Sequence, residues 1–374
     1  MNKIYEILCY ITSFQLLLFS IFLFTQKNGR ITSNKILSLF FLAKGIAIIE
    51  LILICNGNLI FNNFPYLFFI AGSFDFLFGP TLYLYVKSVI FDKFKLRKID
   101  IIHLIPFILY NIFFLTQYHI YPPDIQREMI QNGFLGTIFL KYILWTVFHG
   151  LVFIYMMLII RLLFIYSNEI KNNYSNIKEI NLKWLKIVIY GFICMWSFYL
   201  INYIVYTIRV KDSTLLNLFG KLTLVGFSTF LIYKVLINPE IIPGINIIKG
   251  KNKNDYKNTN KDDLLKLTSY MKTEKPYLEP NLVIHELAER TSISHRKLSY
   301  IINKELNKNF FNFINEYRIN EAKTLLLKPE SSKKTILEVL YESGFNSKSV
   351  FNSIFKKQTG YTPSEFKKNF FSCD

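Results

Sequence analysis

The stretch KTILEVLYESGFNSKSVFNSIFKKQTGYTPSEFKK, residues 334–368, decides the fold of the C-terminal part of the chain. Its apolar residues recur at helical spacing on both sides of Gly344, where a tight turn between two helices needs a residue that accepts a positive φ. Thr362-Pro363-Ser364-Glu365 predicts a further helix, with threonine as its cap, proline in the first helical position and glutamate reaching back to the cap. The pattern is typical of a helix-turn-helix that binds DNA.

A second copy of this pattern lies upstream, at an offset of 52 residues that becomes 53 after the turn. The corresponding pairs are Ala288 with Leu340, Ser292 with Gly344, Ile293 with Phe345, Leu298 with Phe351 and Ile302 with Phe355. Between the copies, residues 310–327 carry apolar side chains at helical spacing. We therefore expect two helix-turn-helix motifs whose recognition helices are held in a fixed relation by a connecting helix.

The whole chain is both apolar and basic: of its 374 residues 52% are hydrophobic and 17% aromatic, and the formal net charge is +18. This combination is typical of a membrane protein with Lys and Arg in its cytoplasmic loops, with or without a nucleic-acid-binding module. The four cysteines, Cys9, Cys55, Cys194 and Cys373, are scattered and favour neither a disulfide framework nor a zinc site. We expect no metal centre and no cofactor.

Seven apolar segments approach the roughly 20 residues that a helix needs to cross a bilayer core. They are Ile4 to Phe24, Ile36 to Cys55, Tyr66 to Ile90, Ile101 to Gln117, Phe134 to Ile160, Trp184 to Ile208 and Leu215 to Leu236. The fourth is short and contains Pro106, so a count of six spans stays an alternative. Because no small-residue cleavage site follows the first segment, we expect a span there and not a removable signal peptide.

The charge of the loops predicts the orientation of this bundle. Loops one, three and five hold eleven Lys and Arg residues, whereas the N-terminal tail with loops two, four and six holds four. Since positively charged loops stay on the cytoplasmic side, we expect the N-terminus outside. Seven crossings then bring the C-terminal domain into the cytoplasm, where DNA lies. The expected location is the inner (cytoplasmic) membrane, as a multi-pass protein.

Ionisable residues interrupt the apolar segments at Lys44, Glu50, Asp75 and His149. Counted at about 1.5 Å per residue, Lys44 and Asp75 both fall near the middle of the membrane. A lone charge is costly there, so we expect such residues to face the bundle interior and to find partners. Three interpretations stay open for this set: a structural ion pair, a ligand pocket or switch, and a proton or ion path.

The chain divides into three parts. Residues 1–237 form a seven-span sensor or anchor domain, residues 238–261 a polar linker rich in Asn and Lys, and residues 262–374 the domain with both helix-turn-helix motifs. The expected fold class is all-α: a polytopic transmembrane helical bundle of about seven spans, followed by a cytoplasmic domain with two helix-turn-helix motifs joined by a long helix.

The C-terminal domain carries a specific set of motif residues. They are Arg318, Ala322, Leu325 and Leu326 in the connecting helix, then Gly344-Phe345, Phe351, Phe355-Lys356, Gly360 and Thr362-Pro363-Ser364-Glu365-Phe366. This arrangement resembles the AraC/XylS family of bacterial transcription regulators, over about residues 262–368. The resemblance implies sequence-specific binding at promoters, usually activation, with double-stranded promoter DNA and RNA polymerase as partners.

The resemblance also implies which residues contact DNA. It places base-reading positions at Arg296, Ser299, Tyr300, Lys348, Ser349, Asn352 and Ser353, while Lys304, Lys356 and Lys357 suit phosphates. The first copy departs from the family pattern at its turn, where Ser292 replaces the usual glycine. Tyr300 and Ser353 stand where the family often has arginine.

We expect a membrane-bound one-component regulator, in which an unidentified signal ligand sensed in or across the membrane controls the DNA-binding domain. In the alternatives, the bundle is a passive anchor or a transporter-like module. We expect no enzyme. The run His285-Glu286-Leu287-Ala288-Glu289 lacks the second histidine of the metallopeptidase motif and lies in a predicted DNA-binding helix, which disfavours metallopeptidase chemistry. A homodimer is a further expectation, since two linked domains could share one operator.

Overall fold

A computed structural model describes residues 3–26, 31–55, 63–91, 94–132, 138–177, 183–209, 214–237, 261–327 and 334–371. Every regular element in these ranges is a helix, and β-structure is confined to isolated bridges such as the one between Tyr174 and Val283. The all-α prediction is therefore confirmed.

The helices form two compact units. The first consists of Met1–Leu163 and Leu182–Asn246, and the second of Phe164–Asn181 and Ile247–Asp374. The segment from Phe164 to Asn181, which the sequence analysis assigned to the membrane domain, thus belongs to the unit with the helix-turn-helix motifs. The predicted linker 238–261 lies outside the described residues except for Lys261.

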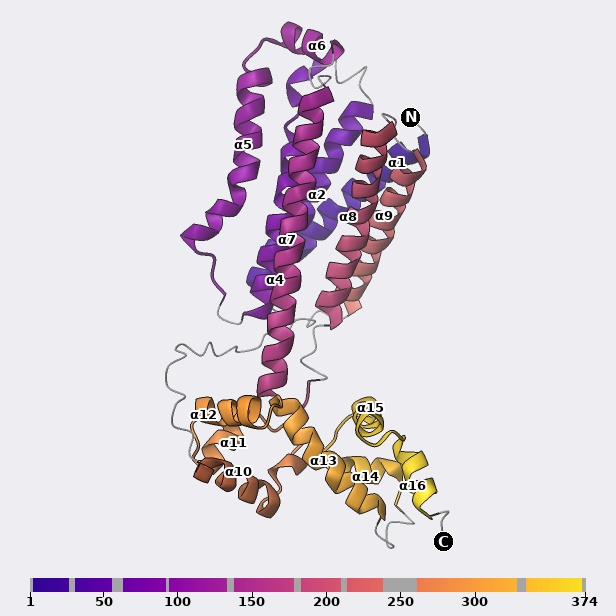
Figure 1. The fold of residues 1–374 in the computed structure, drawn as a ribbon. Coiled ribbons are helices and arrows are strands. Elements are labelled where there is room, and N and C mark those ends of the chain that lie inside the picture. The colour runs from indigo at the N-terminus through magenta and orange to yellow at the C-terminus, as the bar shows by residue number, and fades with distance from the viewer. Residues whose placement is uncertain are drawn as a thin grey trace. The chain divides into compact units, whose positions relative to one another are not determined.

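The first unit holds the apolar helices, except for the end of one of them, α7 (Ile138–Asn173), which from Phe164 on belongs to the second unit. They are α1 (Lys3–Thr25), α2 (Ile31–Cys55), η1 (Pro65–Leu67), η2 (Ala71–Leu77), α4 (Phe78–Ile90), η3 (Lys98–Leu104), α5 (Ile105–Phe114), η4 (Leu115–His119), α6 (Pro123–Gln131), α7 (Ile138–Asn173), α8 (Lys183–Arg209) and α9 (Thr214–Ile237). Helix α1 packs against α2 and α9, α2 also packs against α4, and α8 packs against α9 (Figure 1).

Six segments of the described chain are long and apolar enough to cross a membrane. They are Glu6–Thr25, Ile31–Glu50, Pro65–Ile90, Lys98–His119, Tyr142–Asn173 and Leu185–Ile208. The predicted seventh segment is α9, a continuous helix of 24 residues, and its role as a span stays a prediction. In the fourth segment, Pro106 lies in the first turn of α5, where a missing backbone N–H breaks no helical hydrogen bond.

Helix α7 extends further along the chain than the apolar segment predicted from the sequence. The predicted fifth segment ended at Ile160, but the helix continues to Asn173. Tyr166 and Ile170 explain the extension, because they lie four residues apart on one helical face and both are buried.

Serine side chains join α1 to α2. The hydroxyls of Ser20 and Ser38 each donate to the other residue's backbone carbonyl over 2.8 Å, and the Ser13 hydroxyl donates to the Gly45 carbonyl over 3.0 Å. Small polar residues that let two backbones approach and bond across the contact are typical of helix packing in membranes.

The second unit holds both predicted helix-turn-helix motifs. Its remaining elements are α10 (Lys261–Thr273), η5 (Pro276–Leu278), α11 (Ile284–Thr291), α12 (His295–Tyr300), η6 (Ile301–Glu305), α13 (Phe310–Leu327), α14 (Ile336–Glu342), α15 (Lys348–Thr359) and α16 (Pro363–Phe371). Helices α11 and α12 form the first copy, and α14 and α15 the second.

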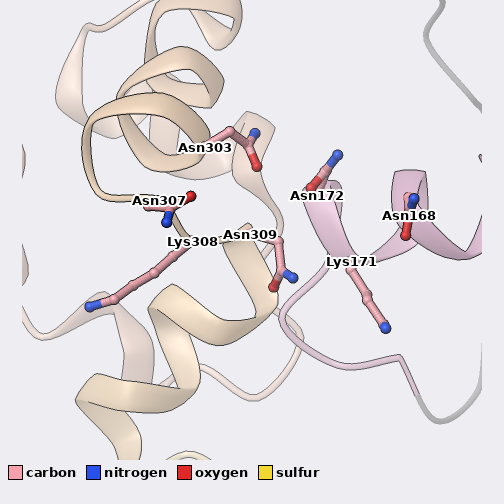
Figure 2. A pocket seen from close by; sticks show the side chains of 7 residues that line it. All are labelled: Asn168, Lys171, Asn172, Asn303, Asn307, Lys308 and Asn309. Carbon is pink, nitrogen blue, oxygen red and sulfur yellow. The ribbon is translucent and has the colours of Figure 1, made fainter.

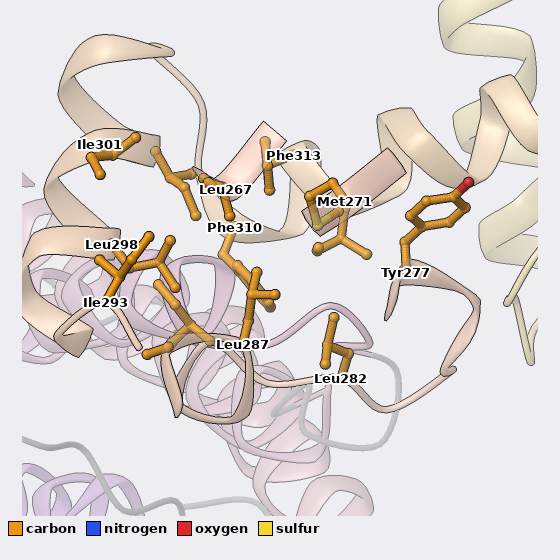
Figure 3. Close-up of a cluster of buried hydrophobic side chains, with 14 residues drawn as sticks. Leu267, Met271, Tyr277, Leu282, Leu287, Ile293, Leu298, Ile301, Phe310 and Phe313 are labelled. Atoms are coloured by element: carbon orange, nitrogen blue, oxygen red, sulfur yellow. The ribbon is translucent and has the colours of Figure 1, made fainter. Parts of the chain in front are cut away.

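Helix α13 connects two separate cores. Its first half contributes Phe310, Phe313 and Ile314 to the core of the first copy, which Figure 3 shows together with residues of α10, α11 and α12. Its second half contributes Ala322 and Leu326, among others, to the core of the second copy. Because one rigid helix belongs to both cores, it fixes the two motifs relative to each other, as the sequence predicted.

The caps of the second copy follow the predicted chemistry. The Thr362 backbone N–H donates to the Glu365 carboxylate over 2.8 Å, and the Glu365 N–H donates to the Thr362 hydroxyl over 3.3 Å. Thr335 and Glu338 form the same reciprocal pair at the start of α14. Each pair satisfies backbone donors that the first turn of a helix leaves free.

The turns of the two copies take the same backbone conformation with different residues. Gly344 has φ of 84° and Ser292 has φ of 51°. A side chain costs about 1–2 kcal/mol in this left-handed region, so Ser292 stores strain that Gly344 avoids.

Replacing Ser292 with glycine is therefore expected to stabilise the first copy by about 0.5–1 kcal/mol, part of the relieved strain being offset by the entropy of glycine in the unfolded chain. Native-state hydrogen exchange of α11 and α12 in the full-length protein measures this change. Unchanged or faster exchange would show that Ser292 is not strained.

Candidate nucleic-acid interface

The recognition helix of the second copy, α15, has a polar face and an apolar face. Phe351 and Phe355 are fully buried in the core. The predicted base-reading residues lie on the other side: Lys348, Ser349 and Ser353 are exposed, and Asn352 is half-buried. Because residues three and four apart share a helical face, these four side chains form one surface.

Two phosphate-binding candidates lie at the end of the same helix. Lys356 and Lys357 are exposed in the last turn of α15. Positive charge is favourable at a helix C-terminus, so these ammonium groups sit there without destabilising the helix and remain available to an anion.

The recognition helix of the first copy is less regular. Helix α12 begins after Ser294, whose hydroxyl accepts the Lys297 backbone N–H over 3.4 Å. The chain then changes to a π-helical turn, η6, which has no counterpart in α15. The Asn303 amide donates to the carbonyl and hydroxyl oxygens of Ser299 over 2.8 and 3.1 Å.

The predicted contact residues of the first copy also share one face. Arg296 and Lys304 are exposed, and Ser299 and Tyr300 are half-buried. Lys297, by contrast, is half-buried and forms an ion pair with Asp263 of α10. Arg296 is thus the cation that α12 presents on this face.

His295, next to Arg296, adds no positive charge at neutral pH. Its partial burial lowers the pKa of the imidazole below the ordinary value, and the neighbouring charges of His285 and Arg296 act in the same direction. DNA bases in contact with α12 would therefore face the charged guanidinium of Arg296 next to the neutral imidazole of His295.

The cores of the two copies are joined through Arg318 of α13, which the sequence identified only as a residue that matches the family pattern. Its side chain is 2% exposed, and its guanidinium donates to the carbonyls of Tyr277 and Glu279 over 2.7 Å each. The guanidinium also lies 5.7 Å from the centre of the Phe345 ring in the second copy. Burial lowers the pKa of Arg318 to about 10, so it remains charged at neutral pH. No local pattern in the sequence signals this long-range role.

A polar pocket of about 290 Å³ lies in the same unit. Figure 2 shows that the last turns of α7 form one side of it and the end of the first copy the other. Its lining consists of amide and ammonium side chains, from Asn168, Lys171, Asn172, Asn303, Asn307, Lys308 and Asn309.

In the first unit, Lys44 and Asp75 form the ion pair that their positions in the sequence allowed. The Lys44 Nζ lies 2.7 Å from the Asp75 Oδ1. Glu50 is 7% exposed, and its carboxylate accepts the Gly72 backbone N–H. Glu50 therefore helps to fix the start of η2, the element that carries Asp75.

His149 is not hydrogen-bonded to that pair and lies in an aromatic environment. Its ring is 5.0 Å from the Tyr203 ring and 6.2 Å from the Trp196 ring. Neither ring nitrogen of His149 has a hydrogen-bond partner among the described residues, and the Tyr199 hydroxyl and the Trp196 indole N–H are likewise without one there.

A buried lysine that the sequence analysis did not single out lies in the same region. Lys221 of α9 is 2% exposed, and its Nζ is 5.6 Å from the centre of the Tyr199 ring. The Nζ of Lys44 lies 5.4 Å from the same ring. Lys221 lies within an apolar segment of the sequence, and this position alone could have identified it as a buried ionisable residue.

Replacing Lys44 with methionine is expected to lower the stability of the first unit by about 2 kcal/mol, because it leaves the Asp75 carboxylate without its partner in an apolar environment. Thermal unfolding of the full-length protein in lipid nanodiscs measures the change. The double variant Lys44→Met/Asp75→Leu should recover most of the loss. Equal stability of the single variant and the wild type would show that the pair does not stabilise the unit.

No group of three or more His, Cys, Asp or Glu side chains within the described ranges could hold a metal ion. The site is thus a set of exposed hydrogen-bond donors and cations on two helices, which is the chemistry that base edges and phosphates bind.

Comparison with known proteins identifies relatives of the second unit. A helix-turn-helix domain family matches residues 287–369. The chain is 38% identical over 100 residues to an uncharacterized HTH-type transcriptional regulator in the cgkA 5'region of Pseudoalteromonas carrageenovora, a match that covers 26% of this chain and 57% of that protein. It is 28% identical over 136 residues to the xylose operon regulatory protein of Haemophilus influenzae, covering 36% and 33%.

A third relative is the arabinose operon regulatory protein of Escherichia coli, 30% identical over 89 residues, covering 24% of this chain and 30% of that protein. The chain thus spans 57% or less of the length of these relatives. They are regulators of transcription and not enzymes. No solved structure matches the chain.

Proposed function

We propose, from the premise that the C-terminal helices form an AraC-type helix-turn-helix domain, that this chain is a membrane-bound one-component transcription regulator. In this proposal the domain binds double-stranded promoter DNA with a recognition helix from each copy. A signal sensed in or across the membrane controls that binding.

The observation that carries the DNA-binding part is the pair of recognition helices on one connecting helix. Helices α12 and α15 each bury an apolar face and expose a face with cations and hydrogen-bond donors. Because α13 belongs to both cores, the two faces keep a fixed relation, which reading two segments of one operator requires.

The membrane part of the proposal is supported by apolar surface that the described residues leave exposed. Along α1, Ile7, Phe14, Leu18 and Ile21 recur at helical spacing and are between 55% and 69% exposed. Water would solvate such a continuous stripe poorly, whereas lipid chains would cover it at no cost. The loop charges predict the cytoplasmic side for the C-terminal domain, which agrees with a DNA-binding role.

The sensing part rests on the buried polar side chains of the bundle. His149, Trp196 and Tyr199 hold polar atoms without partners among the described residues. Because such groups are costly inside a membrane, they are rare there and typically mark a functional site. In the alternative functions the bundle is a passive anchor or a transporter-like module.

Reporter output separates sensing from anchoring. We expect His149→Phe to abolish the response to membrane-derived signals while the chain still inserts and still binds DNA. Unchanged signal response would favour the anchor, and uptake of a solute by vesicles containing the chain would favour the transporter.

Substitutions on α15 test DNA binding. Lys348→Ala and Asn352→Ala are each expected to weaken operator binding by about 1–3 kcal/mol and to relax the preference for particular bases. Lys356→Ala should weaken binding to all DNA alike and reduce the slope of log affinity against log salt by about 1. Gel-shift titrations of the full-length protein in nanodiscs measure both.

The matched control is Lys272→Ala, which removes an exposed lysine from the last turn of α10, on neither recognition helix. It should leave both affinity and salt slope unchanged. Equal losses for Lys272 and Lys348 variants would show that bulk charge, and not the α15 surface, determines binding.

A further inference from the structure

The chain that follows α7 binds the DNA-binding domain through its backbone. Tyr174 forms an antiparallel bridge with Val283, which places Ser175 opposite Leu282 and Asn176 opposite Asn281. The Ser175 backbone N–H donates to the Leu282 carbonyl over 3.2 Å, and the Asn176 amide donates to the Asn281 side-chain oxygen over 3.0 Å. These partners belong to one compact unit, although more than 100 residues separate them in the sequence.

Ser175 is the centre of this contact, and it is 1% exposed. Besides its N–H, its hydroxyl donates to the Leu282 carbonyl over 2.6 Å and accepts from an Arg318 Nη2 over 3.2 Å. Its own carbonyl accepts from the Asn315 amide over 3.4 Å. Every polar group of one loop serine is thus bonded to the DNA-binding domain, which a chance surface contact would not produce.

The location of the contact links it to DNA binding. Arg318 and Asn315 lie on α13, between the half that enters the first core and the half that enters the second. Arg318 also holds the carbonyls of Tyr277 and Glu279 and packs against Phe345. A segment that bonds to Arg318 therefore acts on the junction between the two motifs.

The docked segment does not cover the predicted DNA-contacting residues of α12, η6 and α15. With Ser175 in place, Arg296, Lys304 and Lys348 remain exposed. The contact is also polar: beside it, α7 faces the first copy across the pocket of amide and ammonium side chains in Figure 2. Water can replace such hydrogen bonds at small net cost, so the segment can dock and release.

We propose that Tyr174–Asn176 is a docking segment for the face formed by Asn281, Leu282, Asn315 and Arg318, and that docking stabilises, through Arg318, the relation of the two motifs that α13 sets and that binds the operator. This inference rests on the proposed function and identifies the contact through which the signal would regulate DNA binding. A signal that moves α7 changes docking, and with it DNA binding, through a contact separate from the 238–261 linker.

A disulfide tests whether the segment docks. Residues 176 and 281 continue the antiparallel register of the Tyr174–Val283 bridge, and their side chains are hydrogen-bonded over 3.0 Å. Opposed residues of this kind are suitable positions for an engineered disulfide. In full-length protein in nanodiscs with Cys9, Cys55, Cys194 and Cys373 replaced by alanine, Asn176→Cys/Asn281→Cys should cross-link under mild oxidation. Failure to cross-link, while the Ser175 amide exchanges freely with solvent, overturns the docking.

DNA binding tests the regulatory role. Ser175→Leu, which removes the hydroxyl bonds and is too large for the site, should weaken operator binding about tenfold, and the oxidised Asn176→Cys/Asn281→Cys variant should bind at least as tightly as its reduced form. Ser167→Leu makes the same change within α7, at a half-buried serine before the docking segment. This matched control should bind like the wild type. Unchanged or tighter binding by Ser175→Leu overturns the role.

The two failures are distinguishable. If the wild type binds no promoter DNA, the proposed function is wrong, and the regulatory role falls with it even when the cross-link forms. If the wild type binds and the cross-linked protein binds more weakly than the reduced one, docking opposes DNA binding and the inference alone is wrong.

Discussion

Replacing Arg318 with methionine is expected to destabilise the DNA-binding unit by about 3–5 kcal/mol. Methionine keeps much of the volume but removes the donors that hold the Tyr277 and Glu279 carbonyls and the Ser175 hydroxyl. Buried acceptors that lose their partners cost about 1–3 kcal/mol each, partly relieved when water enters. The two cores should lose their fixed relation as well, because Arg318 also contacts Phe345.

Pulse proteolysis of the full-length protein measures this loss, with cleavage sites mapped to residues 261–371. Arg290→Met is the matched control, since Arg290 pairs with the Glu279 carboxylate on the surface over 2.5 Å. An exposed pair of this kind contributes about 1 kcal/mol or less. Similar losses for the two variants would show that the buried network around Arg318 is not what joins the motifs.

Gly344→Ala is expected to destabilise the second copy by about 3 kcal/mol. One part is the left-handed backbone, with φ of 84°, where a side chain costs about 1–2 kcal/mol. The other part is steric, because a Cβ at this position would lie 2.5 Å from the Tyr277 carbonyl oxygen and 2.7 Å from the Leu278 Cα. Both are backbone atoms, so η5 would have to move away from the turn.

Gly360→Ala separates the two causes. Gly360 has φ of 81°, but a Cβ there would meet no atom of the described residues within 4 Å beyond its own chain neighbours. It should lose only the conformational part, about 1 kcal/mol. Hydrogen exchange of α14 and α15 measures both variants, and equal losses would contradict the close approach of the second turn to η5.

Local rules account for much of what the sequence predicted correctly. The reciprocal cap of Thr362 and Glu365 depends on residues three apart, and the left-handed turn at Gly344 depends on one residue. The two cores on α13 follow from helical periodicity over a single segment. These features are encoded within a few residues, so the sequence alone reveals them.

Long-range contacts account for what the sequence did not show. Ser175 and Arg318 are 143 positions apart. No local sequence pattern around either residue predicts their contact. The extension of α7 beyond Ile160 depends on burial of Tyr166 and Ile170. The repeat predicted two similar recognition helices, but the first ends in a π-helical turn. The predicted base contacts remain predictions, because they concern DNA and not the fold.

Promoter binding by the membrane-bound chain is tested by a map of promoter occupancy in cells that carry the full-length chain. The map is made by cross-linking DNA to protein recovered from the membrane fraction. We expect discrete enriched promoters that share a sequence motif and are lost in the Lys348→Ala/Asn352→Ala variant. Membrane-fraction protein with no promoter enriched above that variant would contradict it.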